Sequence, residues 1–202
     1  MPYDPWGNIT TRNGIQGDLV ISALQKSIRR GLTEEAVTFA YEMYITSEQF
    51  EDKLWRRLQA ISVEDVGFGD LSAPVLINAL NQMRQNFPYT DGDRPIFFVH
   101  AIRYLSAAQK DRTSDNLKNI VKTEFAYGRK PEIPDFALDK HTQKGRAMGR
   151  DFKHFLEEGS QLENEISVDE NYRSRLLELL DKIEREKPEM VEGAFIYDGW
   201  QA

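Results

Sequence analysis

Hydrophobic residues recur along most of the chain at the three- and four-residue spacing that places them on one face of a helix. The spacing predicts helices over residues 18–30, 33–44, 47–61, 72–86, 95–108, 115–126 and 172–187. The alternation of apolar and polar residues that is typical of strands does not reach a convincing length. We therefore predict an all-α fold, a compact bundle of five to six helices with an irregular C-terminal segment and a final acidic helix.

Capping residues define several of the predicted helix ends more closely. Asp18, Thr33 and Ser47 each open an apolar helical pattern, and their side-chain oxygens can accept a hydrogen bond from a free backbone N–H group there. Gly31 follows two arginines at the end of the first pattern, where a left-handed glycine commonly ends a helix.

The chain between the sixth and the last predicted helix is harder to assign. Residues 131–137 contain two prolines, which disfavour a helix, so we expect an extended segment there. Residues 141–158 stay open between helix and loop, because Gly145 and Gly149 weaken a helix without forbidding it.

These patterns divide the chain into an N-terminal tail (1–16), a helical core domain (17–128) and a C-terminal extension (129–202) that packs on the core or on a partner.

Cysteine is absent, which excludes disulfides, thiolate catalysis and cysteine-ligated metal centres. The N-terminus lacks a signal-peptide pattern, and no apolar run approaches the roughly 18 residues of a membrane span. We therefore expect a cytoplasmic location and no membrane association.

The net charge of −7 is unevenly distributed. Residues 157–192 hold 12 acidic and 5 basic residues, whereas residues 110–153 hold 11 basic and 7 acidic ones. The acidic balance therefore belongs to the C-terminal part, and the middle of the chain is mildly basic. Direct nucleic-acid binding through the 110–153 segment is one of the functions that this distribution leaves open.

An acidic pair, Glu64 and Asp65, lies where the third predicted helix meets a turn at residues 67–70. Paired carboxylates beside a turn are typical of metal sites and of acid–base chemistry. Adjacent residues of an α-helix point about 100° apart, however, so both reach one metal ion only if the backbone turns there. We favour a structural role at a helix end, with Arg56, Arg57 or nearby backbone donors as partners.

Other catalytic patterns are scarce. The chain has three histidines, His100, His141 and His154, and none is followed by the aspartate that an all-α metal phosphohydrolase site would need. A P-loop, a nucleophile elbow and a Ser-His-Asp arrangement are not found in the sequence. We assign no catalytic residue, no metal ligand and no cofactor. The alternative is an enzyme acting on a nucleotide or a phosphorylated small molecule, with the acidic pair, His100 and residues 141–150 in one pocket.

The segment from His141 to Arg150 is the strongest candidate for binding chemistry. Glycines and cations lie close together in it: Lys144, Gly145, Arg146, Gly149 and Arg150. As a loop, its backbone amides and basic side chains would hold a phosphate or nucleic acid, and as a helix its glycines would admit a second backbone at an interface. The alternative is a packing segment whose cations are solvated or paired with the acidic C-terminal part.

Three strings together resemble a known family. Residues 18–29 and 36–43 are similar to consecutive helices, and the string Arg56-Arg57-Leu58 through Ser62-x-Glu64-Asp65-Val66-Gly67 to Asp70 is similar to a following motif, in the C-terminal helical region of the MgsA/RarA-type AAA+ ATPases. These are clamp-loader-like ATPases of replication-associated recombination. The resemblance covers about residues 18–108, and without a P-loop it implies no ATP hydrolysis.

In that family the C-terminal helical region mediates tetramer formation. The resemblance therefore implies a homo-oligomer, with a tetramer favoured, and a replication or repair protein as a partner. We expect a non-enzymatic, self-associating helical module linked to DNA replication, recombination and repair complexes. A structural junction within it would be formed by Arg56, Arg57, Glu64, Asp65, Gly67 and Asp70.

Overall fold

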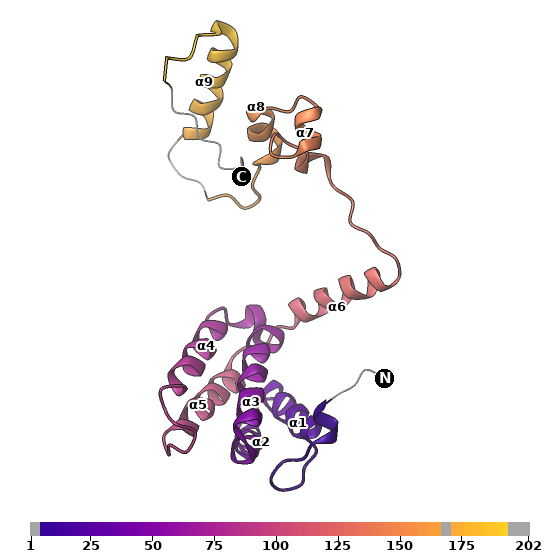
Figure 1. The fold of residues 1–202 in the computed structure, drawn as a ribbon, viewed down its shortest axis with the longest axis vertical. Helices are drawn as coiled ribbons and strands as arrows, with labels where there is room; N and C mark the ends of the chain where they lie inside the picture. Colours follow the sequence, from indigo (N-terminus) through magenta and orange to yellow (C-terminus); the bar gives the residue numbers. More distant parts are fainter. Residues whose placement is uncertain (1–4, 167–170, 194–202) are drawn as a thin grey trace. The chain divides into compact units, whose positions relative to one another are not determined.

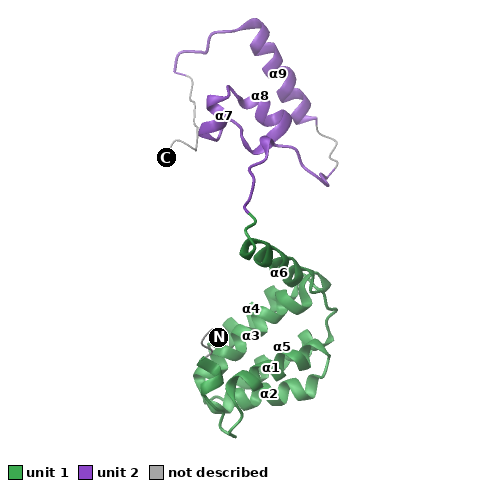
Figure 2. Cartoon of the chain, turned by 90° about the vertical axis from the view of Figure 1, so that its right-hand side faces the viewer, with its two compact units in different colours: residues 1–129 green, residues 130–202 purple. Residues whose placement is uncertain are grey.

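The computed structural model describes residues 5–166 and 171–193, and its regular structure is helical (Figure 1). The chain divides into two compact units, Met1–Arg129 and Lys130–Ala202 (Figure 2). No strand forms in the described part of the chain, so the predicted all-α fold is confirmed. No helix among these residues is long and apolar enough to cross a membrane.

The first unit contains every helix predicted before residue 127. Its elements are η1 (Pro5–Asn8), α1 (Gly17–Arg29), α2 (Thr33–Thr46), α3 (Glu48–Ile61), α4 (Ala73–Arg84), α5 (Arg94–Ala107) and α6 (Thr113–Ala126). Between α3 and α4 the chain forms a π-helical turn, η2 (Ser62–Val66), and a 3-10 turn, η3 (Gly67–Gly69). Helices α1–α5 form the bundle, and α6 projects from it (Figure 1).

The core of this unit is built from the apolar faces of α1–α5. Its largest almost fully buried apolar side chains are Leu24, Ile28, Met43, Leu54, Trp55, Leu58, Ile61, Ile77, Phe98, Ile102 and Leu105. Burying each of these stabilises the fold by about 1.5–3 kcal/mol before the cost of ordering it. On α1 the buried stripe includes Val20 and leaves its apolar neighbour Leu19 exposed. Val20 has the four-residue spacing from Leu24 that the core-facing stripe requires.

Two predicted helix boundaries are confirmed by their hydrogen bonds. Ser47 caps α3, since its Oγ accepts a hydrogen bond from the Phe50 N–H group at 3.3 Å. Gly31 follows α1 with a φ of +73°, a left-handed conformation that glycine adopts without a steric penalty.

Two predicted caps, Asp18 and Thr33, are wrong, since both residues lie inside the first turns of their helices. α1 already begins at Gly17, whose N–H group donates to the Ile9 carbonyl at 2.9 Å. The Thr33 N–H group bonds to the Gly31 carbonyl at 3.0 Å, so Thr33 already belongs to the turn that opens α2.

The segment expected as an N-terminal tail is folded over residues 5–16. Trp6 packs edge-on against Phe50 of α3, with ring centroids 5.1 Å apart. Thr10 and Gln16 form an isolated antiparallel bridge that closes the loop before α1. These contacts attach the segment to the bundle.

A buried charged cluster joins α3, α4 and α5. Glu51 of α3 is fully buried, and its Oε2 lies 3.0 Å from Arg84 Nη1 and 2.9 Å from Arg94 Nη2. Arg94 also donates to the backbone carbonyl of Phe87 in the loop between α4 and α5. A buried carboxylate is tolerated only with such partners, so the cluster fixes the relative positions of three helices. No sequence motif pointed to it.

The second unit holds four short elements and one longer helix: η4 (Asp135–Ala137), α7 (Gln143–Ala147), α8 (Phe152–His154), the π-helical turn η5 (Phe155–Gly159) and α9 (Tyr172–Glu186). The segment 131–137, expected to be extended, ends in the 3-10 turn η4, so that prediction is wrong over its last three residues. Residues 141–158 form short helices separated by Gly149. α9 is the predicted late helix; it ends at Glu186, and the next residue, Lys187, caps it with a φ of +44°.

Candidate functional site

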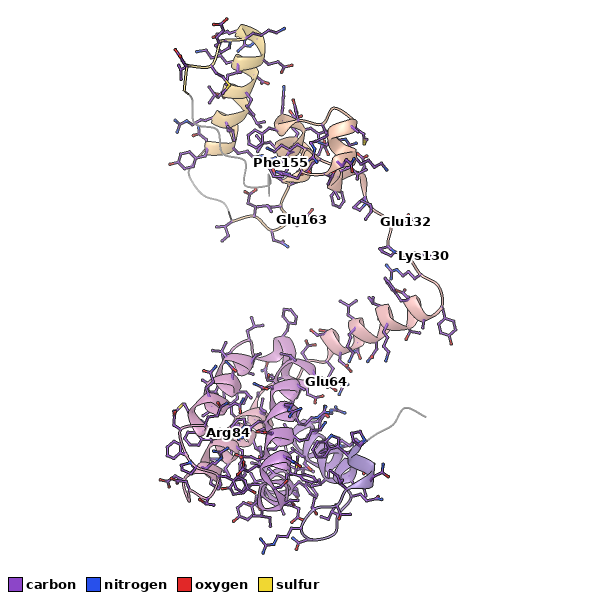
Figure 3. All side chains as sticks on the ribbon, in the orientation of Figure 1. Glu64, Arg84, Lys130, Glu132, Phe155 and Glu163 are labelled. Carbon is purple, nitrogen blue, oxygen red and sulfur yellow. The ribbon has the colours of Figure 1, made fainter. Side chains whose placement is uncertain are left out.

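The acidic pair lies in η2, at the junction between the bundle and α6 (Figure 3). Asp65 is fully buried. Its Oδ1 accepts hydrogen bonds from Arg29 Nε at 2.7 Å and from Arg112 Nη1 at 2.6 Å, and its Oδ2 accepts one from Gln25 Nε2 at 2.9 Å. Gln25 and Arg29 belong to α1, and Arg112 immediately precedes α6. Asp65 therefore ties α1 and the start of α6 to the end of α3 through charge-assisted hydrogen bonds.

Glu64 lies beside the same donors but is partly exposed. Its Oε1 accepts a hydrogen bond from Gln25 Nε2 at 3.1 Å and lies 3.6 Å from Arg29 Nη2 and 3.7 Å from Arg112 Nη2. Arg57 reaches this group indirectly, by donating to Gln25 Oε1 at 3.2 Å. We call this group the Asp65 cluster; its members are Gln25, Arg29, Glu64, Asp65 and Arg112.

The partners of the acidic pair differ from those expected. Arg56 is exposed, and Arg57 bonds to Gln25 instead of to a carboxylate. The cations come from Arg29 and Arg112, which are 36 and 47 residues from Asp65 along the chain. The sequence around the acidic pair could not predict these two arginines. They reach η2 only because α1 packs beside it and because the chain passes it just before α6 begins.

Two glycines of the junction are required by a close chain crossing. A Cβ atom on Gly67 would lie 2.6 Å from the Asp111 carbonyl oxygen, and one on Gly69 would lie 2.5 Å from the Gln109 carbonyl oxygen. Gly67 also has a φ of +50°, which disfavours other residues. The Asp111 N–H group donates to the carbonyls of Asp65 and Val66 at 3.0 and 3.1 Å, which holds the crossing in place.

Asp70 closes the junction on the side of α4. Its carboxylate accepts hydrogen bonds from the Ser72 hydroxyl at 2.7 Å, from the Ser72 N–H group at 3.0 Å and from the Tyr104 hydroxyl. The Ser72 hydroxyl, followed by Tyr104, lowers the pKa of Asp70, because these donors favour the ionised carboxylate. Asp70 thereby connects the start of α4 to α5.

This geometry pairs the buried carboxylate of Asp65 with cations. Asp65 accepts hydrogen bonds from two guanidinium groups and one amide, which occupy lone pairs that a metal ion or a substrate proton would use. In α6, Asp115 pairs with Arg112 and Lys118 and continues the ion-pair network. Among the residues that the structure describes, no group of three or more Asp, Glu or His residues could hold a metal ion. The arrangement suits a structural connection between α6 and the bundle.

The candidate binding segment, His141–Arg150, contains the five-residue helix α7 (Gln143–Ala147). Thr142 caps it by accepting a hydrogen bond from the Gly145 N–H group at 3.0 Å. Gly145 is buried, and a Cβ atom there would lie 1.9 Å from the Asp139 carbonyl oxygen. Gly149 ends the helix with a φ of +76°, and the Arg150 N–H group bonds back to the Gly145 carbonyl at 3.0 Å. Both glycines thus serve the local fold.

Several polar side chains of this segment bind other residues of the second unit. His141 Nδ1 lies 2.9 Å from Asp139 Oδ2, and Arg146 donates to a neighbouring backbone carbonyl at 3.0 Å. Arg150 Nη2 lies 2.6 Å from both carboxylate oxygens of Asp135. His141 lowers the pKa of Asp139 through this contact. Lys144 is exposed.

The mildly basic 110–153 segment also uses many of its cations internally. Arg112 and Lys118 pair with Asp115, and Lys153 lies 2.7 Å from Asp181 Oδ1. The Lys110 ammonium group donates to three backbone carbonyls at the end of α5, at 2.6, 2.7 and 3.2 Å. These contacts leave fewer of its charges for a phosphate backbone than the sequence count suggests.

The groups required by the enzyme alternative belong to different units. The acidic pair and the exposed His100 on α5 are in the first unit, and residues 141–150 are in the second. The structure describes each unit by itself, so it does not place these groups in a common pocket.

An exposed apolar surface beside the junction was not predicted. Val63, Phe68, Leu71 and Val75 are all at least half exposed, and Phe68 reaches 73% between its two packed glycines. A hollow of about 180 Å³ lies among the first three, and it is lined by Ser62, Val63, Gly67, Phe68, Leu71, Pro74 and Ser114. Contiguous exposed apolar surface is typical of interaction sites. The sequence signal was the occurrence of Phe68 and Leu71 in a turn, outside any helical stripe.

The comparisons with known proteins assign no family to this geometry. No protein-family model matches the chain, and no curated protein matches it either. The arguments for a function therefore come from the junction, the exposed apolar surface and the sequence strings described above.

Proposed function

We propose that this protein is a non-enzymatic, self-associating helical module that works within DNA replication, recombination or repair complexes. The observation that carries the self-association is the exposed apolar surface of the first unit around Phe68 and along α6. The neutralised Asp65 cluster favours a structural role for the best acidic candidate, since its buried carboxylate already has two cationic partners.

The link to DNA metabolism rests on the resemblance of residues 18–108 to the C-terminal helical region of the MgsA/RarA-type ATPases. That resemblance favours a tetramer, a replication or repair protein as partner, and a cytoplasmic location. The structure adds a reason for the shared Gly67, because the crossing of Asp111 leaves no space for a side chain there.

Size-exclusion chromatography with light scattering tests the self-association directly. We expect a mass that is a multiple of 23.4 kDa at micromolar concentrations. A mass of one chain across the range from about 1 to 100 μM would contradict the proposal, because specific stable interfaces hold well below that range.

The DNA link requires a separate measurement. Addition of the purified protein to a clamp-loader-like recombination ATPase is expected to give a co-eluting complex, and an unrelated ATPase serves as the control. Titration of single- and double-stranded DNA at several salt concentrations tests the direct-binding alternative, for which affinity would fall steeply with salt. If neither the ATPase nor DNA is bound, the link to replication and repair is wrong.

A further inference from the structure

Helix α6 exposes an apolar stripe that no residue of the described part of the first unit (5–129) covers. Leu117, Ile120, Val121 and Phe125 lie within an arc of roughly 140° on the helix and are between 39% and 61% exposed. Asp115 is the buried residue of α6, and it lies on a different face of the helix. α6 is therefore attached to the bundle through polar contacts at its start, while its apolar face is exposed within the first unit.

The start of α6, which precedes the stripe, borders the apolar surface beside the junction. A hollow of about 280 Å³ is lined by Ala60, Val63, Glu64, Ser114, Asp115 and Lys118. It shares Val63 and Ser114 with the smaller hollow beside Phe68. A cavity of about 150 Å³ is enough for a benzene ring, so each hollow has room for an aromatic side chain. The start of α6 and the junction thus form a corner whose exposed apolar residues are Val63, Phe68 and Leu71, and we call it the apolar corner.

The area and charge of this surface suit a second copy of the chain. Eight exposed apolar residues form it: Val63, Phe68, Leu71, Val75, Leu117, Ile120, Val121 and Phe125. At roughly 100 Å² each they expose about 800 Å², which is the share of one partner in a standard interface. α6 carries two acidic and two basic residues, and residues 1–129 carry 16 acidic and 15 basic ones, so two copies approach with little repulsion.

We infer that two chains associate through α6, with the two helices antiparallel and crossing near Val121. This places Leu117 of each chain opposite Phe125 of the other and brings the end of the second α6 to the apolar corner near Ser114. A parallel arrangement would bring both bundles to the same end of the helix pair and leave the corners uncovered. Equivalent contacts then bury the stripe of both chains, as in a twofold interface. The inference rests on the self-association in the proposed function.

A matched pair of variants tests the surface in the full-length protein. Ile120→Asp places a charge in the proposed interface, and Ile96→Asp places the same charge at a similarly exposed isoleucine on α5 (54% against 59%). We expect Ile120→Asp to weaken association at least tenfold, the loss typical of a central interface residue, and Ile96→Asp to leave it unchanged. Circular dichroism of both variants checks that helix content is preserved.

Cysteine cross-linking tests the orientation without a disruptive substitution, because the chain has no cysteine of its own. A mixture of Leu117→Cys and Phe125→Cys chains is expected to give a disulfide-linked heterodimer on mild oxidation, since a disulfide needs Cα atoms within about 7 Å. A parallel pair would instead link Leu117→Cys to itself, which would contradict the antiparallel arrangement. Ile96→Cys, which lies outside the surface, is expected not to cross-link.

The outcomes distinguish the α6 interface from the self-association on which it rests. A wild-type chain that is monomeric contradicts the self-association and, with it, the use of α6. A wild-type oligomer whose mass and affinity are unchanged by Ile120→Asp contradicts the α6 interface and leaves the self-association standing. An oligomer lost in Ile120→Asp and kept in Ile96→Asp supports both.

Discussion

Among the individual residues, Asp65 joins three segments that are far apart in the sequence. It is a fully buried anion whose charge is balanced by Arg29 and Arg112 from two other segments. Removing one member of such a group leaves the others without their counter-charge, and this costs more than an exposed ion pair contributes. Glu64 touches the same cations but is in contact with water, so solvent screens its contribution.

We expect Asp65→Asn to lower the free energy of unfolding by about 2–4 kcal/mol, because two partly buried guanidinium groups lose their anion. Urea denaturation measures this difference. Glu64→Gln is the matched control and is expected to cost less than about 1 kcal/mol. Equal effects of the two substitutions would show that Asp65 is not the centre of the cluster.

Asp70 gives a prediction about pH. Its pKa is lowered in the folded state, so its carboxylate contributes stability above its unfolded pKa of about 4, and this contribution is lost as the pH falls through the folded value. Ser72→Ala removes the hydroxyl that lowers the pKa most, so we expect the pKa of Asp70 to rise. Carboxyl carbon NMR titration measures it, with Ser114→Ala as the control. An unchanged pKa in Ser72→Ala would contradict the assigned cause.

At the scale of elements, the helices follow their apolar stripes, while their ends depend on neighbouring segments. α3 begins at a cap that its own sequence supplies, through Ser47. α1 and α2 begin where the preceding loop and turn have already fixed the backbone. The junction after α3 depends on a distant segment as well, since residues 109–111 cross directly over its two glycines.

The caps can be distinguished by substitution. We expect Ser47→Ala to destabilise the protein by about 1 kcal/mol, because the Phe50 N–H group loses its acceptor. Thr33→Ala is expected to change stability by less than about 0.5 kcal/mol, since Thr33 lies inside the first turn of α2. Thermal or urea unfolding of the two variants measures both, and a larger cost for Thr33→Ala would contradict the assigned helix start.

The close crossing of two chain segments at the junction can be tested in the same way. Gly69→Ala would place a Cβ atom 2.5 Å from the Gln109 carbonyl oxygen, so the two backbone segments must move apart. We expect a loss of about 2 kcal/mol or more in the free energy of unfolding. Gly92→Ala, which meets no atom within 4 Å, is expected to be neutral or to stabilise by up to about 1 kcal/mol. Comparable stability of the two variants would mean that the crossing is not close.

At the scale of the whole molecule, the excess of negative charge lies in one of the two units. Residues 1–129 are almost neutral, and the excess of acidic residues belongs to residues 130–202. The exposed apolar corner and α6 belong to the almost neutral unit. Apolar surface associates most readily where charge repulsion is small, so the first unit is the better place for contact between copies.

This division predicts how association responds to salt. An interface formed by the apolar stripe of α6 should keep its dissociation constant within about threefold between 0.05 and 0.5 M NaCl, because Debye screening acts on charges. Sedimentation equilibrium at the two salt concentrations measures it. A dissociation constant that rises tenfold or more with salt would instead indicate an interface held by ion pairs.

Much of the fold could be predicted because helical stripes are a local property of the sequence. The apolar spacing predicted every helix of the bundle, and Ser47 and Gly31 marked their boundaries. The partners of Asp65 and Glu51 could not be predicted, since Arg29, Arg112 and Arg84 are distant in sequence and have no motif. The role of residues 141–150 stayed open for a different reason, because only the three-dimensional path of the chain brings the Asp139 carbonyl against Gly145 and shows why Gly145 has no side chain.

The sequence by itself determined the all-α class, the apolar faces of the helices and the absence of cysteine chemistry, since each follows from residue type and local spacing. The tertiary structure decided which charges are neutralised and which apolar faces stay uncovered. Those properties depend on contacts between segments far apart in the chain, as when α1 and the approach to α6 meet at Asp65. The sequence predicted that α6 is amphipathic. Only the structure shows that the core of the bundle forms from α1–α5 and leaves the apolar face of α6 exposed.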